Sequence, residues 1–348
     1  MRILAIETSC DETAIAVVEG KGGIKKPSFE ILSSLIFSQI PFHKEYGGVV
    51  PNIAKREHIK SLPLLLEKTA KKIDLASIDQ IAVTVGPGLE PALWSGIEFA
   101  RELSKKMKKP LFGANHLKGH LYSFLLDNPE KKKIFPAIGL IVSGGHTILL
   151  YMKSLTEYKK IGETRDDAAG ESFDKAARLL VFPYPGGPEI EKAAKKGNPE
   201  AIAFPRPMIN QKNYDFSFAG LKTALLYNIA GQKADWDKFN KGKAIKPENA
   251  DDLAASFQSA VIDCLTGKTM RAAKDFSARS VILSGGVAAN KALRGTFRKK
   301  TSAAKINFFA PQQKYNTDNA AMIATASYIE IMSGKKRRIS ANGNLGIH

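Results

Sequence analysis

One pattern occurs twice in this 348-residue chain, and it limits the folds that the chain can adopt. Residues 2–7 form an apolar run, residues 8–13 a polar turn, and residues 14–18 a second apolar run. The same order returns at 137–142, 143–147 and 148–152. Each copy predicts an antiparallel hairpin whose tip carries small, hydroxyl or glycine residues. Such tips can offer backbone N–H groups to a phosphate.

A second unit also repeats, later in each half. An expected strand at 80–85 leads through Gly86-Pro87-Gly88 into an expected helix at about 91–107. Another strand at 280–283 leads through the turn 284–290 into a helix that ends near residue 299. Strand, glycine turn and helix make a βα unit whose helix N-terminus faces the turn. We interpret the two halves as an internal duplication, which predicts an α/β fold of two similar lobes.

The rest of the chain completes this division. Helical apolar spacing is present at 53–72, 171–180 and 250–274, and the segment 231–249 has the composition of a loop. We expect an N-terminal lobe at 1–130, a C-terminal lobe at 131–330 and a basic tail at 331–348. The tail is rich in glycine and asparagine near its end, which favours an arm or a partly disordered segment.

Charge and cysteine content restrict the partners and the compartment. The net charge of +18 and pI of about 9.7 favour a polyanionic partner, most simply a nucleic acid, although general lysine richness is the alternative. Cys10 and Cys264 are too few for a disulfide framework, which suits a reducing, cytoplasmic setting. No apolar run reaches the roughly 18 residues that a membrane span needs.

A histidine pair is the strongest candidate for a metal site. His116 and His120 are four residues apart, which places them on one face of a helix and lets both imidazoles reach one ion. Asp318 is a candidate third ligand, expected from the other lobe, with Asn316 or Thr317 placed to cap the following helix. A solvated helix face and a carboxylate at a helix start are the alternatives.

Glycine turns and acidic residues predict a nucleotide cleft. The turns 143–147 and 284–290 carry little side-chain bulk and lie at equivalent places in the two halves, although such turns are common after strands. Further acidic residues have two alternative roles, as helix caps or as ligands of ribose hydroxyls: Asp11, Glu12, Asp166, Asp167, Glu171 and Asp174.

Nine ordered motifs in this chain are similar to those of one family. They lie at residues 7–13, 86–89, 116–120, 142–147, 166–175, 185–188, 216–223, 284–290 and 317–320. The chain resembles the tRNA threonylcarbamoyladenosine transferase family known as TsaD over about residues 2–330. The resemblance implies the fold of the actin, sugar kinase and heat-shock ATPase superfamily, with two duplicated lobes.

The resemblance also implies site residues. It implies one divalent metal ion per subunit, iron favoured over zinc, bound by His116, His120 and Asp318. Asp11 and Glu12 correspond to an acidic pair near the metal and are the candidates for proton transfer. The implied contacts of the substrate nucleotide are Ile141, Val142, Ser143, Gly144, Gly145, Asp174, Gly187 and Asn290.

The implied reaction moves a threonylcarbamoyl group from threonylcarbamoyl-AMP to the exocyclic amine of adenosine 37, in tRNAs that read codons beginning with A. The implied partners are tRNA, a TsaB-type paralogue and a TsaE-type P-loop ATPase, and a homodimer is the alternative to the paralogue. The chain departs from the family pattern at Lys118 and Asn52, where Glu is common, and at Leu89-Glu90-Pro91.

Three other functions fit part of this pattern. A metalloprotease would need a general base where Gly119 stands. A kinase or ATPase would suit the glycine turns but needs no histidine pair. A non-catalytic tRNA scaffold would need neither the histidines nor Asp318.

Overall fold

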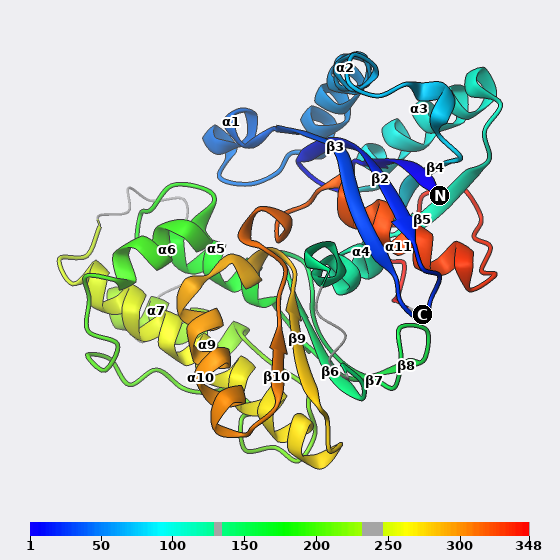
Figure 1. Ribbon diagram of the computed structural model, residues 1–348. Coiled ribbons are helices and arrows are strands. Elements are labelled where there is room, and N and C mark those ends of the chain that lie inside the picture. The colour runs from blue at the N-terminus through cyan, green and yellow to red at the C-terminus, as the bar shows by residue number, and fades with distance from the viewer. Residues whose placement is uncertain (129–133, 232–245, 348) are drawn as a thin grey trace. The chain divides into compact units, whose positions relative to one another are not determined.

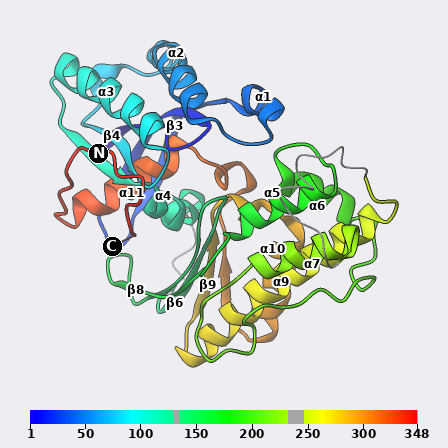
Figure 2. The same ribbon diagram turned by 180° about the vertical axis from the view of Figure 1, so that it is seen from behind.

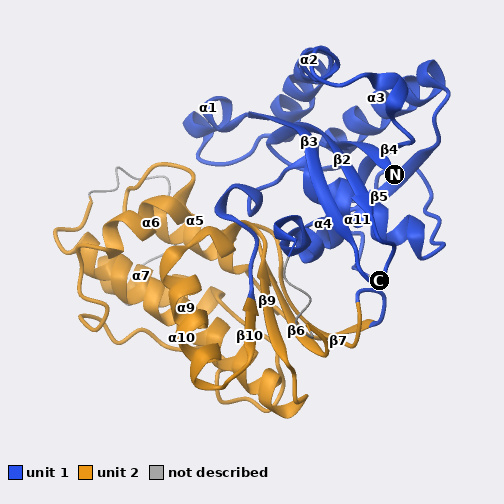
Figure 3. Cartoon of the chain, in the orientation of Figure 1, with its two compact units in different colours: residues 1–133, 155–157, 309–348 blue, residues 134–154, 158–308 orange. Residues whose placement is uncertain are grey.

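A computed structural model describes residues 1–128, 134–231 and 246–347. The chain forms two compact units, which Figure 3 colours separately. The first comprises Met1–Lys133, Leu155–Glu157 and Phe309–His348, and the second comprises Ile134–Ser154 and Tyr158–Phe308. The opening segment of the first unit ends at Lys133, and the sequence predicts a lobe boundary near residue 130. The expected end of the C-terminal lobe at residue 330 is wrong, because the chain returns to the first unit from Phe309 onward.

The two sheets share one topology. The first has the order β3-β2-β1-β4-β5, formed by β1 (Arg2–Glu7), β2 (Glu12–Lys21), β3 (Ser28–Ser38), β4 (Gln80–Gly86) and β5 (Leu111–Asn115). The second has the order β10-β9-β6-β7-β8, formed by β6 (Ala137–Val142), β7 (Thr147–Met152), β8 (Tyr158–Glu163), β9 (Ser280–Ser284) and β10 (Asn307–Phe309). In each sheet the first strand pairs antiparallel with the second and parallel with the fourth. This shared order is what the repeated sequence pattern predicts.

In the first unit, helices cover both faces of the sheet. Figures 1 and 2 show α2 (Pro51–Ala70) and α3 (Glu90–Met107) on one face, and α4 (His116–Tyr122) and α11 (Ala320–Met332) on the other. Successive strand residues point to opposite faces, so Leu4 and Ile6 pack against α2 and α3. Glu7 therefore shares the opposite face, toward α4. The short helices are α1 (Ile40–His43), η1 (Lys44–Tyr46), η2 (Leu75–Ser77), η3 (Ser123–Asp127) and η5 (Gln313–Tyr315).

In the second unit, the helices pack together beside the sheet, as Figure 2 shows. They are α5 (Ala169–Leu179), α6 (Gly186–Ala194), α7 (Ala219–Ala230), α9 (Ala250–Asp275) and α10 (Lys291–Ala303), with the short η4 (Gly286–Ala289). The helices expected at 53–72, 171–180 and 250–274 are confirmed, with every end within two residues of its expected position. Most of the expected loop 231–249 lies outside the described residues. Within the described ranges, no helix is both long and apolar enough to cross a membrane.

The C-terminal segment is ordered, so the expectation of an arm is wrong for residues 338–347. The Asn342 N–H donates to the Val85 carbonyl at 2.9 Å, and the Asn115 side-chain amide donates to the Gly346 carbonyl at 2.7 Å. A Cβ at Gly86 would lie 2.0 Å from the Asn342 oxygen, so glycine is required there. Apolar residues within the polar tail pack against the core of the first unit: Ile339, Ala341 and Leu345.

Candidate metal centre and nucleotide pocket

The histidine pair lies on α4, which begins directly at the end of β5. The side chain of Asn115 accepts a hydrogen bond from the Lys118 N–H at 3.1 Å and so caps the helix. His116 and His120 then lie one turn apart, with ring centroids 4.7 Å from each other. Both rings are buried, and His120 has no exposed surface.

Asp318 completes a cluster with these histidines. Its Oδ1 lies 3.1 Å from His120 Nε2 and 3.6 Å from His116 Nε2. Asn319 caps α11 by accepting from the Met322 N–H at 2.9 Å, so the expected capping by Asn316 or Thr317 is wrong. Asp318 precedes that cap and lies in the same unit as the histidines. The expectation that it comes from the other lobe is therefore also wrong.

The cluster has the donor set of a metal site. One ligand atom from each of His116, His120 and Asp318 lies within 4.8 Å of the others. Both ring nitrogens of His120 are buried, and within the described parts of the chain neither makes a hydrogen bond of good geometry, although Nε2 faces the Asp318 carboxylate. A buried imidazole without a hydrogen bond is costly, and a cation bound to Nε2 and Asp318 would supply the missing interaction. Two imidazoles and a carboxylate match the three-ligand sites of zinc and non-haem iron.

Glu7 is a functional candidate that the sequence reasoning did not single out. It is fully buried and accepts from the Ser9 N–H at 2.5 Å and the Thr84 hydroxyl at 2.7 Å. Its Oε2 lies 3.1 Å from His116 Nδ1, the nitrogen that faces away from Asp318. A carboxylate behind a ligating histidine fixes the ring orientation and tautomer. The sequence signal that could have identified Glu7 is its position as an acidic residue at the end of the apolar run 2–7.

The charges of this cluster support one another. Burial opposes ionisation of Glu7, but the His116 charge and hydrogen bond outweigh it and hold the pKa of Glu7 below its usual value. Burial also acts to lower the pKa of His116, yet the Asp318 and Glu7 charges raise that pKa to about 9. In the metal-free protein His116 therefore carries a proton at pH 7, and a cation must displace it to bind.

Glu12 lies close enough to Asp318 and to Asp11 to interact with both electrostatically. Burial raises the pKa of Glu12 well above its usual value, and the charges of Asp11 and Asp318 add to this effect. Glu12 therefore ionises less readily than an exposed glutamate. The structure thus places Glu12 near Asp318 and shifts its pKa in the direction opposite to that of Glu7.

A buried polar network holds the acidic turn in place. His58 of α2 lies with Nδ1 2.8 Å from the Thr13 hydroxyl and Nε2 3.0 Å from the Cys10 carbonyl. The Gln39 amide lies 3.1 Å from the same Nδ1. Gln39 donates to Nδ1, so the proton of His58 is on Nε2 and points at Cys10. Burial lowers the pKa of His58 to about 4, which keeps the ring neutral. Sequence reasoning missed this network, since its members are scattered.

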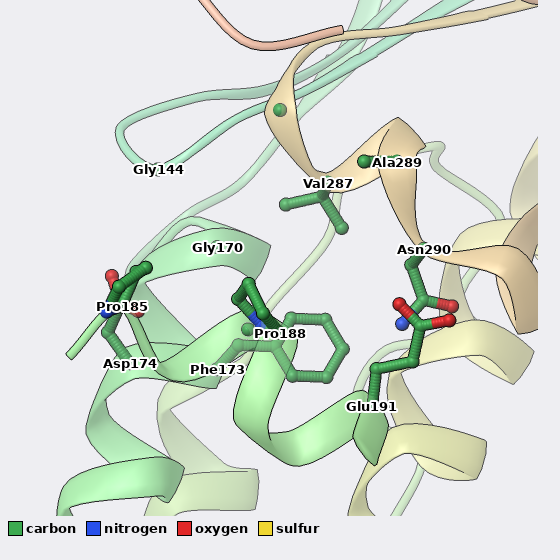
Figure 4. Close-up of a pocket in the computed structure, with 12 residues that line it drawn as sticks. Gly144, Gly170, Phe173, Asp174, Pro185, Pro188, Glu191, Val287, Ala289 and Asn290 are labelled. Carbon is green, nitrogen blue, oxygen red and sulfur yellow. The ribbon is translucent and has the colours of Figure 1, made fainter. Parts of the chain in front are cut away.

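A pocket of about 180 Å³ lies in the second unit (Figure 4). Figure 4 shows Asp174 and Pro185 at one end and Glu191 and Asn290 at the other. The lining residues are Gly144, Gly170, Phe173, Asp174, Pro185, Gly187, Pro188, Glu191, Gly286, Val287, Ala289 and Asn290. Both glycine turns singled out from the sequence thus contribute to one pocket.

Four of the eight expected substrate contacts line this pocket: Gly144, Asp174, Gly187 and Asn290. The other four do not. Ile141 and Val142 are buried within β6, and Ser143 and Gly145 lie in the adjoining turn. Two of the lining side chains also hold the pocket together.

Asp174 and Asn290 have structural partners in the pocket wall. Asp174 accepts from the Gly186 N–H at 2.8 Å. The Asn290 oxygen caps α10 through the Leu293 N–H at 2.9 Å, and its amide donates to Gln258 at 2.7 Å. These bonds hold the two side chains in the pocket wall. The oxygen and the amide nitrogen of Asn290 therefore each have a partner within the protein.

The two duplicated sheets define the class of this protein, an α/β protein of the actin-like ATPase fold. A crystal structure of HypF from T. kodakarensis has this fold, with a TM-score of 0.60 at 15% identity over 95% of this chain and 48% of that one. An activator of 2-hydroxyisocaproyl-CoA dehydratase from Clostridium difficile gives a TM-score of 0.50 at 14% identity, over 98% of this chain and 100% of that one. At such low identity these matches support the fold alone.

Sequence relatives identify the family. The family model described as tRNA N6-adenosine threonylcarbamoyltransferase, TsaD, matches residues 30–325. A protein of that name from Thermosipho melanesiensis is 48% identical over 100% of both chains. Another from Bacillus subtilis is 45% identical over 100% of this chain and 95% of its own. The chain belongs to the tRNA N6-adenosine threonylcarbamoyltransferase family and is a transferase of tRNA modification.

Proposed function

We propose that this protein transfers the threonylcarbamoyl group of threonylcarbamoyl-AMP to the exocyclic amine of adenosine 37, in tRNAs that read codons beginning with A. The observation that supports this most directly is the convergence of His116, His120 and Asp318 on one point. AMP is already a good leaving group in a mixed anhydride, whereas an adenine amine is a weak nucleophile. Catalysis must therefore come from positioning the reactants and stabilising developing charge.

His116, His120 and Asp318 would hold one divalent metal ion, with iron favoured over zinc. When bound, the ion would supply Lewis-acid stabilisation of phosphate or carbonyl oxygens. Glu7 would hold the His116 ring in the orientation that presents Nε2 to the ion. The His58 network would hold the turn that carries Asp11 and Glu12.

Asp11 or Glu12 would accept the proton that the adenine amine loses. Burial and the charges of Asp11 and Asp318 raise the pKa of Glu12 well above its usual value, which makes its carboxylate form a stronger proton acceptor. The pocket around Gly144, Asp174, Gly187 and Asn290 would receive the nucleotide part of the donor, since its glycine-lined wall leaves backbone groups accessible.

The positive charge of +18 would hold the tRNA through phosphate contacts, so binding should weaken steeply with salt. We further propose a cytoplasmic location and assembly with a TsaB-type paralogue and a TsaE-type P-loop ATPase. A homodimer is the alternative to the paralogue.

The test is to incubate the pure protein with threonylcarbamoyl-AMP and unmodified tRNA, with and without these partners, and to assay the modified nucleoside. Asp318→Ala should abolish metal retention and transfer while preserving the circular dichroism spectrum. Glu102→Ala, an exposed acidic residue on α3, is the matched control and should behave as wild type. Full activity of the Asp318→Ala variant would remove the proposed metal role. Peptide cleavage, or steady ATP turnover without tRNA, would instead favour the protease or ATPase alternatives.

A further inference from the structure

A buried ion pair lies on the face of α4 opposite the histidines. Lys118 stands between His116 and His120 in sequence, so its side chain points away from them. It is 1% exposed, and its Nζ lies 2.7 Å from Glu330 Oε1 on α11. Glu330 is 2% exposed. Burying two charges is costly, and a buried pair is weak evidence of a contribution to stability. Its presence beside a candidate metal centre therefore calls for another explanation.

The two helices also touch at a second point. A Cβ at Gly119 would lie 2.9 Å from Ile323 Cδ1 and 3.1 Å from Met322 Cγ, so α4 approaches the first turn of α11 closely. Glu330 lies seven residues beyond Ile323, which is about 10 Å along a helix axis. The Gly119 contact limits how closely the helices approach each other. The Lys118–Glu330 ion pair is a second contact, farther along the axis of α11. It limits rotation and sliding of α4 along α11.

The metal ligands are divided between these same two elements. His116 and His120 belong to α4, and Asp318 lies two residues before α11 begins. The distances from Asp318 to the two imidazoles therefore depend on how α4 is rotated against α11. Building on the proposed metal centre, we propose that Lys118 and Glu330 are positioning residues, whose ion pair sets the helix register in which the three ligands converge.

The C-terminal segment reinforces this arrangement. Arg337 also bonds Glu330 Oε1, at 3.1 Å, just before the segment turns back along the first unit. Its Gly346 carbonyl then accepts from Asn115, the residue that caps α4. The C-terminal segment thus holds α4 through its cap, Asn115, and α11 contacts α4 at Lys118 and Gly119.

Replacing both charges by methionine separates positioning from stability. An apolar pair of similar length fills the same space, and such replacements are often neutral or stabilising. Lys118→Met/Glu330→Met should therefore keep the metal-free protein folded, with a modest loss of melting temperature because Arg337 loses its contact with Glu330. It should nevertheless bind zinc more weakly, by about 10-fold or more, as for other groups that orient metal ligands. The measurement is zinc competition against a chromogenic chelator, alongside thermal unfolding of the metal-free protein.

A second ion pair provides the matched control. Arg206→Met/Asp263→Leu removes a pair with a 2.9 Å contact in the second unit and should leave zinc affinity unchanged. A Lys118→Met/Glu330→Met variant that folds and binds zinc as tightly as wild type would overturn the positioning role alone. Failure of the wild-type protein to bind one zinc ion would overturn the proposed metal centre and the positioning role together.

Discussion

Glu7→Gln tests the electrostatic account of the metal centre most directly. The substitution preserves size but removes a buried negative charge. Glu7 accepts from Ser9, Thr84 and His116, and a glutamine amide would turn an N–H donor toward at least one of these donors. The His116 ring then loses the partner that fixes its tautomer.

The change in metal affinity that Glu7→Gln should cause has two opposing contributions. Loss of a group that orients a metal ligand costs about 10- to 100-fold in metal affinity, or about 1.4–2.7 kcal/mol. Protons compete with the metal in the wild type, because the Asp318 and Glu7 charges raise the pKa of His116 to about 9. At pH 7, two units below that pKa, this competition weakens wild-type binding by about 100-fold. Without the Glu7 charge the pKa of His116 falls, so the variant suffers less competition.

The expected result is therefore a deficit that depends on pH. Zinc affinity, measured by chelator competition at pH 7, 8 and 9, should fall most in the variant at pH 9 and least at pH 7. Glu102→Gln, at an exposed position on α3, is the control, and its zinc affinity should equal that of wild type at each pH. Equal zinc affinity of wild type and Glu7→Gln at all three pH values would refute the role of Glu7, and a deficit independent of pH would refute the proton competition.

Three further predictions concern the surroundings of the site. Burial lowers the pKa of His58 from 6.5 to about 4, so the wild type should lose about 3 kcal/mol of stability as pH falls from 6.5 to 4. His58→Gln should lack this part of the slope in denaturant unfolding, and an identical acid slope would contradict the assignment. Gly119→Ala should destabilise the protein by about 1–3 kcal/mol and weaken zinc binding through crowding of Ile323. Gly295→Ala, where a Cβ meets nothing within 4 Å, should be neutral or stabilising, and equal effects at both sites would refute the steric argument. Truncation after residue 341 removes buried Ile347 and should cost about 3 kcal/mol or more, measured by urea unfolding; an unchanged unfolding curve would show that the tail packing contributes nothing.

Much of the fold could be predicted because its signals are local. The hairpins at 2–18 and 137–152, and the βα units that begin at residues 80 and 280, follow from apolar runs and glycine turns within one stretch of chain. The repeat of these signals predicted two sheets of one topology, which the strand orders confirm. The C-terminal segment was misjudged, because its composition is that of a flexible tail. Its few apolar residues matter only where a complementary surface receives them.

Backbone geometry within a few residues is enough to set the helix turns, the spacing of His116 and His120 on one face, and the glycine turns that line the pocket. Long-range packing settles which unit supplies Asp318, that Glu7 supports His116, and that Lys118 has its counter-charge in Glu330. Each of these contacts joins residues more than 100 positions apart. Their meeting depends on how strands and helices pack, which no local pattern in the chain records.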